Sequence, residues 1–209
     1  MKIKSIKVGR RDKEKLVIYT ECGRCISARV DDAYMLREGD ELLSSRADEL
    51  EEKYNKTRVL KSAAGTLARR SVSKYELNRK LRDKGFSDEE SRDAVEWFSK
   101  RGFLDDEAYA GSIVQYYSSR GYGSIRIKEE LSRRGIDRAV SDELIEALPE
   151  RTDEISSLIF KKLGKEELTA ENKRKIVAFL MRRGFRYDEI RVAFENISQT
   201  PELDSEDFQ

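Results

Sequence analysis

Two neighbouring carboxylates, Asp105 and Asp106, are the side chains of this 209-residue sequence that best suit metal-assisted chemistry. Adjacent carboxylates can hold Mg²⁺, but a hydrolytic site needs further ligands that converge on the metal. The pair lies between residues 102–104 and 108–110, in the ordinary context of a helix start. Asp105 is therefore expected to cap a helix and Asp106 to favour its dipole. A nuclease that uses both carboxylates is kept as an alternative.

Histidine is absent from the sequence, and the only cysteines are Cys22 and Cys25. Without histidine there is no Ser-His or Cys-His catalysis, no imidazole proton shuttle and no histidine metal ligand. The cysteines form a lone CxxC, and a zinc site needs two further ligands that no other Cys or His can supply. A redox CxxC normally opens a helix, whereas this one falls in an expected hairpin turn. We predict free thiols, no catalytic residues, no metal, no cofactor and no enzymatic activity.

The chain carries 42 Lys and Arg against 41 Asp and Glu, so its net charge of +1 makes it neither a polycation nor an acidic mimic. Its longest apolar run, residues 176–181, falls far short of the roughly 20 residues that span a bilayer. The first seven residues alternate charged and apolar side chains and offer no signal-peptide core. A soluble cytoplasmic protein without a membrane partner is expected.

The start of the sequence differs from the rest. Alternating and continuous apolar runs predict strands at residues 3–8, 16–19 and 25–30. Asp31 is expected to cap a short helix that stops at Gly39, and from Ser45 onward every signal is helical. A small β segment is therefore predicted to precede a long helical part.

The helical part repeats itself about every 50 residues. A leucine followed four residues later by glycine and then by an apolar residue occurs three times, at Leu81, Leu131 and Leu180. The copies are offset by 50 and 49 residues. Five further apolar columns align in the same register: Leu77, Ile127 and Ile176; Val95, Ile145 and Phe194; Phe98, Leu148 and Ile197; Leu60, Ala110 and Ile159; and Ala64, Val114 and Leu163. Stacked copies would share their apolar faces, as in other repeat proteins.

Each copy is predicted to hold three helices, which gives a mainly α fold of three tandem three-helix repeats in an elongated array after a small N-terminal β-hairpin segment. The middle helices should end at Gly85, Gly135 and Gly184, where a left-handed C-cap needs no Cβ. The expected N-caps are Ser87 (in a capping box with Glu90), Asp137 and Thr152. The predicted parts are a β-rich segment at 1–44, repeats 1, 2 and 3 at 45–102, 103–149 and 150–198, and an acidic tail at 199–209 with Glu202, Asp204, Glu206 and Asp207.

Basic residues recur on the solvent side of the middle helices of repeats 2 and 3. The set is Arg126, Arg133 and Arg134 in repeat 2 and Lys175, Arg182 and Arg183 in repeat 3. On a helical wheel, Arg126 and Arg133 lie about 200–220° from the buried Leu131. Net charge rises from +1 in residues 74–92 to +3 in 120–138 and +5 in 173–191. These cations suit a polyanion or an acidic protein, or they are solvated residues that the helix dipole favours; no base-reading motif is present.

Several short motifs follow one another between residues 70 and 148. They are Ser73-Lys74-Tyr75-Glu76-Leu77, Lys80-Leu81, Lys84-Gly85-Phe86, Gly102-Phe103-Leu104-Asp105-Asp106, Tyr109-Ala110, Gly121-Tyr122-Gly123, Glu130-Leu131 and Gly135-Ile136. In this order and spacing they resemble the RecX family, the regulators of the RecA recombinase. The third copy and the N-terminal β segment extend the match to nearly the whole chain. The arginine that is usual near the start of the second helix is replaced by residues 71–73, with Arg69 and Arg70 just upstream.

The resemblance implies a non-enzymatic modulator built of helix-turn-helix-like modules. RecX-like proteins lie along the groove of the RecA–DNA filament and mostly inhibit the recombinase's ATP hydrolysis, strand exchange and stimulation of repressor cleavage. The implied partners of a monomeric protein are the RecA filament and single- or double-stranded DNA, bound without sequence specificity. The residues predicted to bind them are Arg126, Arg133, Arg134, Lys175, Arg182, Arg183, Arg69 and Arg70. A general DNA-binding helical module without a recombinase partner is the alternative.

Overall fold

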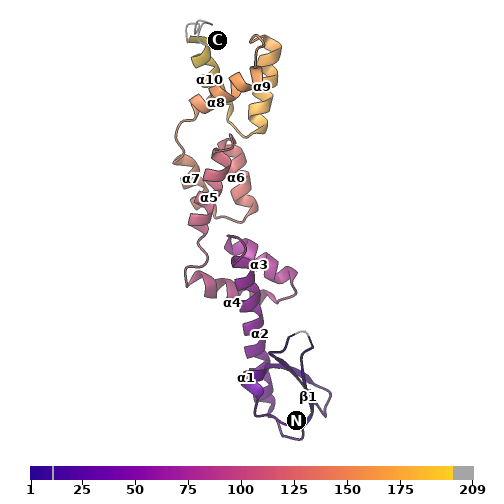
Figure 1. Cartoon of the computed structure of the whole chain (residues 1–209). Helices are drawn as coiled ribbons and strands as arrows, with labels where there is room; N and C mark the ends of the chain where they lie inside the picture. The colour runs from indigo at the N-terminus through magenta and orange to yellow at the C-terminus, as the bar shows by residue number, and fades with distance from the viewer. Residues whose placement is uncertain (11, 200–209) are drawn as a thin grey trace. The chain divides into compact units, whose positions relative to one another are not determined.

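The computed structural model describes residues 1–10 and 12–199, over which the chain forms three strands and ten helices (Figure 1). These residues divide into two compact units. The first consists of Met1–Val72 and Leu77–Leu104, and the second of Ser73–Glu76 and the chain from Asp105 onward. The predicted mainly α fold with a small N-terminal sheet is confirmed. Outside the described residues lie the tail carboxylates Glu202, Asp204, Glu206 and Asp207.

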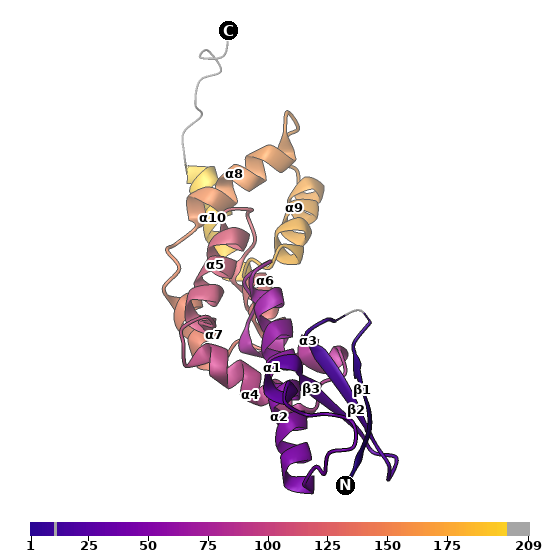
Figure 2. The ribbon, with the colours of Figure 1, turned by 60° about the horizontal axis from the view of Figure 1, so that its bottom comes forward.

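The N-terminal sheet is antiparallel. Its strands, in spatial order, are β1 (Ile3–Val8), β2 (Lys15–Thr20) and β3 (Cys25–Arg29). Leu16 and Ile18 of β2 pair with Ala28 and Ile26 of β3, and all four side chains are buried on one face because side chains alternate along a strand. This face forms a core with α2 (Ser44–Leu67), which Figure 2 shows beside the sheet.

Both cysteines are exposed and have free thiols, as expected. Cys22 lies in the turn between β2 and β3, and Cys25 is the first residue of β3. The turn is closed by Gly23, whose N–H donates to the carbonyl of Thr20 at 3.1 Å. The CxxC therefore belongs to a hairpin and opens no helix.

The short helix after the sheet differs from the prediction. α1 spans only Val30–Ala33, its N-cap is Arg29, and Asp31 lies in its first turn instead of capping it. The expectation of a helix that reaches Gly39 is wrong, because the following backbone is bonded to β1. Gly39 donates its N–H to the carbonyl of Ile3 at 2.9 Å. Groups that would prolong the helix close the edge of the sheet instead.

The helices of repeat 1 are α2, α3 (Lys74–Asp83) and α4 (Asp88–Ser99). α2 buries Val59 and Ala63 in the core that it shares with α3 and α4, whereas Leu60 is half-buried and Ala64 exposed. The predicted column at Ala64 is therefore wrong by one residue, whereas Leu60 packs against the edge of the core. The first turns of this 24-residue helix pack on the sheet through Ala47, and that contact fixes the rotation of the whole helix.

Repeats 2 and 3 belong to the second unit. Their helices are α5 (Asp106–Ser118), α6 (Ser124–Arg133), α7 (Arg138–Glu146), α8 (Thr152–Leu163), α9 (Ala170–Arg182) and α10 (Tyr187–Gln199). Leu131 of α6 and Leu180 of α9 are fully buried, as Leu81 of α3 is in the first unit. The middle helices α3 and α6 have 10 residues each, but α9 has 13 and begins about one turn earlier.

The glycines after the middle helices adopt the left-handed conformation, with φ of 85° at Gly85, 68° at Gly135 and 86° at Gly184. In each case the residue after the glycine donates its N–H to the backbone carbonyl of the buried leucine. These bonds run from Phe86 to Leu81 at 3.3 Å, from Ile136 to Leu131 at 3.2 Å and from Phe185 to Leu180 at 3.2 Å. The apolar residue after each glycine is buried. The predicted C-caps are confirmed as Schellman-type ends, which favour glycine.

Three predicted N-caps are also confirmed. Ser87 and Glu90 form a reciprocal capping box at the start of α4. Asp105 accepts the N–H of Ala108 at 2.9 Å, and Asp137 accepts the N–H of the second residue of α7 at 2.8 Å. Local sequence therefore sets these three helix starts.

The predicted cap at Thr152 is wrong. Thr152 is the first residue of α8, and its N-cap is Arg151, which makes no side-chain capping bond. The Arg151 side chain, 9% exposed, pairs with Glu154 at 2.6 Å and donates to the carbonyls of Ser118 and Tyr122 at 2.9 and 2.5 Å. A guanidinium that reaches back to the end of α5 thus fixes where α8 begins.

Replacing Leu131 by alanine is expected to lower the free energy of unfolding by about 2–5 kcal/mol, because a fully buried leucine leaves a cavity. Denaturant unfolding followed by far-ultraviolet circular dichroism measures the change. Leu168, which is 39% exposed, is the control, and Leu168→Ala should change stability by less than about 0.5 kcal/mol. Equal small effects of the two substitutions would contradict the burial of Leu131.

Candidate partner-binding surface

The residues predicted to bind a partner lie in both units. Arg69 and Arg70 follow α2 in the first unit and are exposed. The other six lie on α6 and α9 of the second unit, where Arg133 and Arg182 are the last helical residues. Arg126 and Lys175 are inside the helices, and Arg134 and Arg183 are the C-caps.

Three of these arginines meet on one buried carboxylate, Glu130 of α6. Guanidinium nitrogens of Arg134, Arg126 and Arg133 lie 2.6, 3.0 and 3.3 Å from its oxygens. Only 8% of the Glu130 side chain is exposed, against 23% for Arg134, 33% for Arg126 and 64% for Arg133. Glu130 therefore neutralises part of the positive charge of repeat 2, and Arg133 is the arginine of this group that solvent reaches most.

The charges of this cluster support one another. The hydrogen bond from Arg134 lowers the pKa of the Glu130 carboxyl, and burial opposes this effect without cancelling it. Burial alone would lower the pKa of the Arg134 guanidinium, but hydrogen bonds with Glu130, Tyr109 and Tyr117 raise it. Sequence reasoning missed Glu130, although its spacing of three or four residues from each arginine is the spacing of helical ion pairs.

Arg183 holds repeat 3 against repeat 2. Its Nη1 donates to the carbonyl oxygens of Arg120 and Gly121 at 2.8 and 3.0 Å, at the C-terminal end of α5. The guanidinium carbon lies 5.2 Å from the ring centre of Tyr122 and 5.0 Å from that of Phe179. A cation at a helix C-terminus is favoured by the helix dipole. This side chain therefore has a structural contact that the helical wheel did not predict.

Beside Arg183, two backbone hydrogen bonds join α6 to the turn after α9. Gly123 and Ile125 donate their N–H groups to the carbonyls of Arg183 and Gly184 at 2.8 and 3.0 Å. A Cβ on Gly184 would come within 2.3 Å of the backbone nitrogen of Arg126, so the two segments touch main chain to main chain. We call this contact the α6–α9 joint.

An equivalent contact is made by the first turn of α3, which belongs to the same unit. The Ser73 hydroxyl donates to the carbonyl of Arg134, the residue that corresponds to Arg183. A Cβ on Gly135 would meet the Cβ of Tyr75 at 2.4 Å. The turn after each of α6 and α9 therefore contacts the first turn of the preceding middle helix, and Arg134 and Arg183 lie at these contacts.

The exposed positive charge is strongest on α9. Lys175 and Arg182 are exposed; Lys175 pairs with Glu171 at 2.8 Å, which raises the pKa of the lysine. Arg182 makes no ion pair with any residue that the structure describes. Phe179 occupies the position that Glu130 has in repeat 2, so α9 carries no equivalent buried carboxylate. Repeat 3 therefore keeps more uncompensated positive charge on its middle helix than repeat 2.

Asp105 and Asp106 both bind backbone amides. Asp105 caps α5, as expected, and Asp106 accepts the N–H of Lys74 at 2.9 Å and so caps the first turn of α3. Within residues 1–10 and 12–199, no group of three or more Asp, Glu and Cys side chains is placed to hold a metal ion. The arrangement of the pair is that of two helix caps.

Comparison with known proteins identifies the family. Family models match residues 105–147 as the second three-helix domain of RecX and residues 150–194 as the third. The regulatory protein RecX of Xanthomonas campestris pv. campestris (strain B100) is 38% identical over 133 residues, which cover 63% of the chain and 82% of that protein. The chain belongs to the RecX family. A further RecX protein, from Stenotrophomonas maltophilia (strain K279a), is 34% identical over 135 residues, with 63% and 82% covered.

Solved RecX structures share the fold. A crystal structure of regulatory protein RecX matches with a TM-score of 0.68 over 93% of the chain and 98% of that structure, at 16% identity. RecX from Lactobacillus salivarius matches with a TM-score of 0.65 over 70% of the chain and 98% of the structure, at 19% identity. The RecX family is one of regulatory proteins. None of the helices described here has the length and apolar character needed to cross a membrane.

Proposed function

We propose that the chain is a cytoplasmic monomer that binds the RecA recombinase and its DNA filament and regulates the recombinase, mostly by inhibition. The regulated activities are ATP hydrolysis, strand exchange and co-protease activity. The observation that carries the proposal is the exposed positive charge of α9, in a chain that belongs to a family of regulatory proteins.

The contacts of the second unit support a division of roles among the basic residues. Arg183 holds repeat 3 on repeat 2 and Arg134 pairs with Glu130, so the charges of both are partly used within the protein. Arg133, Lys175 and Arg182 extend into solvent and bind acidic recombinase surface or DNA phosphates. Because the α6–α9 joint fixes repeat 3 on repeat 2, weak contacts by these two repeats add through their high effective concentration.

Removing the exposed charges of α9 is expected to weaken filament binding. The variant Lys175→Gln with Arg182→Gln should lower affinity for a RecA filament on labelled DNA, measured by fluorescence anisotropy. If both residues contact phosphates, the slope of log affinity against log salt should fall by about 1.4–1.8, because each phosphate contact contributes about 0.7–0.9.

Lys53→Gln with Lys61→Gln is the matched control. It removes the same charge from α2, where Lys53 pairs with Glu49 at the same spacing as Lys175 with Glu171. Binding and salt dependence should stay at the values of the unsubstituted protein. Equal losses in both variants would mean that overall charge, and not the α9 surface, controls binding.

A strand-exchange and ATPase titration separates the classes of function. Inhibition at substoichiometric amounts, with DNA alone bound more weakly than the filament, supports the proposed regulator. Equal binding to naked DNA without any effect on the recombinase would identify a general DNA-binding module instead. Metal-dependent DNA cleavage that Asp105→Asn abolishes would identify a nuclease.

A further inference from the structure

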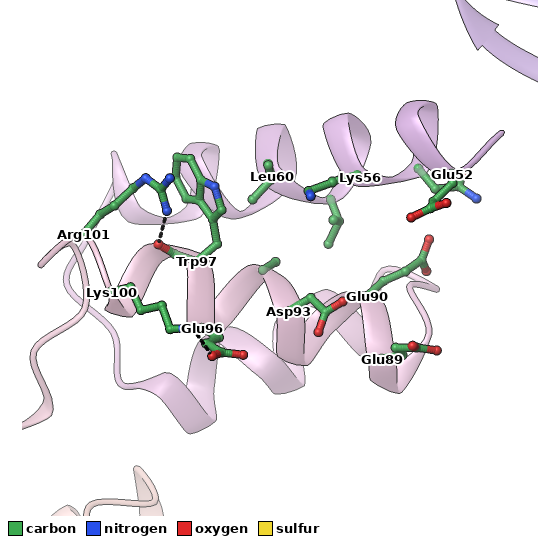
Figure 3. Close-up of a pocket in the computed structure, with 13 residues that line it drawn as sticks. Glu52, Lys56, Leu60, Glu89, Glu90, Asp93, Glu96, Trp97, Lys100 and Arg101 are labelled. Carbon is green, nitrogen blue, oxygen red and sulfur yellow. Dashed lines mark hydrogen bonds and ion pairs between the residues drawn. The ribbon is translucent and has the colours of Figure 1, made fainter. Parts of the chain in front are cut away.

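A groove of about 610 Å³ lies between α2 and α4 in the first unit (Figure 3). Its apolar lining comes from Val59 and Leu60 of α2 and from Ala94 and Trp97 of α4. Trp97 is half-buried, and the guanidinium of Arg101 lies 3.7 Å from its ring centre. Figure 3 shows these two side chains together at one end of the groove.

The other end of the groove is acidic. The lining carboxylates are Glu52, Glu89, Glu90, Asp93 and Glu96. Figure 3 shows Glu52, Glu89 and Glu90 gathered away from Trp97, with Asp93 between. Glu96 pairs with Lys100 at 2.5 Å, and Glu90 accepts the N–H of Ser87. The carboxylates of these two residues therefore have partners within the chain.

The carboxylates of Glu52, Glu89 and Asp93 have no ion pair or hydrogen bond with any described residue. Glu89 and Asp93 are four residues apart on α4, a spacing at which like charges repel each other and destabilise the helix. Elsewhere in the same unit, carboxylates such as Glu49 are paired with two basic residues. Three cations, Lys56, Lys100 and Arg101, line the groove together with its five carboxylates, which leaves a net charge of −2. The groove thus combines an apolar floor with a net negative charge, and Glu52, Glu89 and Asp93 carry the part of it that no ion pair compensates.

The dimensions of the groove match a helix. Its α4 wall extends from Glu89 to Trp97, which at 1.5 Å per residue is about 12 Å, or roughly two helical turns, and Lys100 and Arg101 continue the wall beyond the end of the helix. Two neighbouring helices with an apolar floor form the type of groove into which an amphipathic helix lays its apolar face. Phosphates would be repelled by the three uncompensated carboxylates, which argues against nucleic acid as the occupant.

We propose that this groove binds a lysine- and arginine-rich amphipathic helix of a partner protein. Apolar side chains of that helix contact Leu60 and Trp97, the half-buried apolar residues of the lining, and its basic side chains pair with Glu52, Glu89 and Asp93. The site belongs to the first unit and is independent of the basic surface of α9. A failure of this proposal would leave the proposed regulation of the recombinase untouched, and the reverse also holds.

Trp97 is the single tryptophan of the chain, so its fluorescence reports on the groove directly. The probe is a synthetic 14-residue helical peptide with leucines along one face and lysines on both flanks. We expect a blue shift of the Trp97 emission that saturates at one peptide per chain. Glu89→Lys with Asp93→Lys should raise the dissociation constant at least tenfold, and Glu89→Gln with Asp93→Asn should raise it less.

The matched control is Glu143→Lys with Glu146→Lys on α7, which places the same charge change at repeat-2 positions that correspond to Asp93 and Glu96. Its peptide affinity should stay unchanged, and circular dichroism confirms that each variant is folded. The proposal would be overturned if the peptide left the Trp97 emission unshifted, or if the groove variant and the control variant bound the peptide equally well. It would also be overturned if a peptide with serines in place of the leucines bound as tightly as the original peptide. A salt-sensitive dimer in sedimentation equilibrium that the groove variant abolishes would overturn it too, because the occupant would then be a second copy.

Discussion

Replacing Glu130 by alanine is expected to lower the free energy of unfolding of the second unit by about 3 kcal/mol. Breaking a buried ion pair by removing one partner costs roughly 3–5 kcal/mol, since the other charge remains. The lower end applies here, because the side chains of Arg126 and Arg133 are 33% and 64% exposed, so solvent screens part of the positive charge that Glu130 would leave behind. Denaturant unfolding at pH 7 measures the loss. The control is Glu129→Ala, since Glu129 is 53% exposed and pairs only with Arg126, at 3.2 Å.

The contribution of Glu130 should depend on pH with a defined sign. Its pKa is lower in the folded protein than the ordinary value of 4.5, so folding favours the charged form. The stabilisation is fully present above about pH 4.5 and is lost as pH falls through the lower folded pKa. The stability difference between the unsubstituted protein and Glu130→Gln should therefore shrink below pH 4.5. A difference that stays constant from pH 7 to pH 3 would mean that the cluster contributes packing and no charge pairing.

Gly184→Ala is expected to lower the free energy of unfolding by about 3 kcal/mol. The left-handed backbone costs an alanine about 1–2 kcal/mol. The new Cβ would also lie 2.3 Å from the backbone nitrogen of Arg126, so the turn must move away from α6. Loss of the two backbone bonds of the α6–α9 joint adds about 0.5–1.5 kcal/mol each. Amide hydrogen exchange at Gly123 and Ile125 should speed up with the loss of stability.

Gly85→Ala is the matched control for this substitution. Gly85 has nearly the same φ, 85° against 86°, and occupies the same position in repeat 1. No described atom lies within 4 Å of a Cβ built there. Both alanine variants therefore have the same cost of a left-handed backbone and the same effect on the unfolded chain. The difference between their losses of unfolding free energy measures the contribution of the α6–α9 joint. Equal destabilisation by both would show that the joint contributes nothing to stability.

The repeat and most helix ends could be predicted from sequence because they depend on local interactions. Leu131 and Gly135 mark a buried turn and its left-handed end within five residues of chain. The errors occur where a distant segment intervenes. The sheet sets the rotation of α2 and exposes Ala64, and Arg151 reaches back to the end of α5 and displaces the cap from Thr152.

The candidate site could be predicted only where it depends on a single helix. A helical wheel describes one helix, and it correctly placed Arg133 and Arg182 in solvent. It could not show that the carbonyl of Arg183 meets α6, because that contact joins segments about 60 residues apart. The wheel also could not show that Glu130 is the common partner of three arginines. It places Leu131 inside the repeat, but it does not tell whether the adjacent Glu130 is buried as well.

The early start of α9 changes what the backbone amides at its N-terminal end can bind. In repeat 2, the amide of Gly123 is free to bond to the carbonyl of Arg183 in the following repeat. The corresponding amide of repeat 3 belongs to Asn172, and it already bonds to the hydroxyl of Thr169, the N-cap of the longer helix. The extra turn of α9 therefore uses, within repeat 3 itself, the amide that in repeat 2 serves the contact with the following repeat.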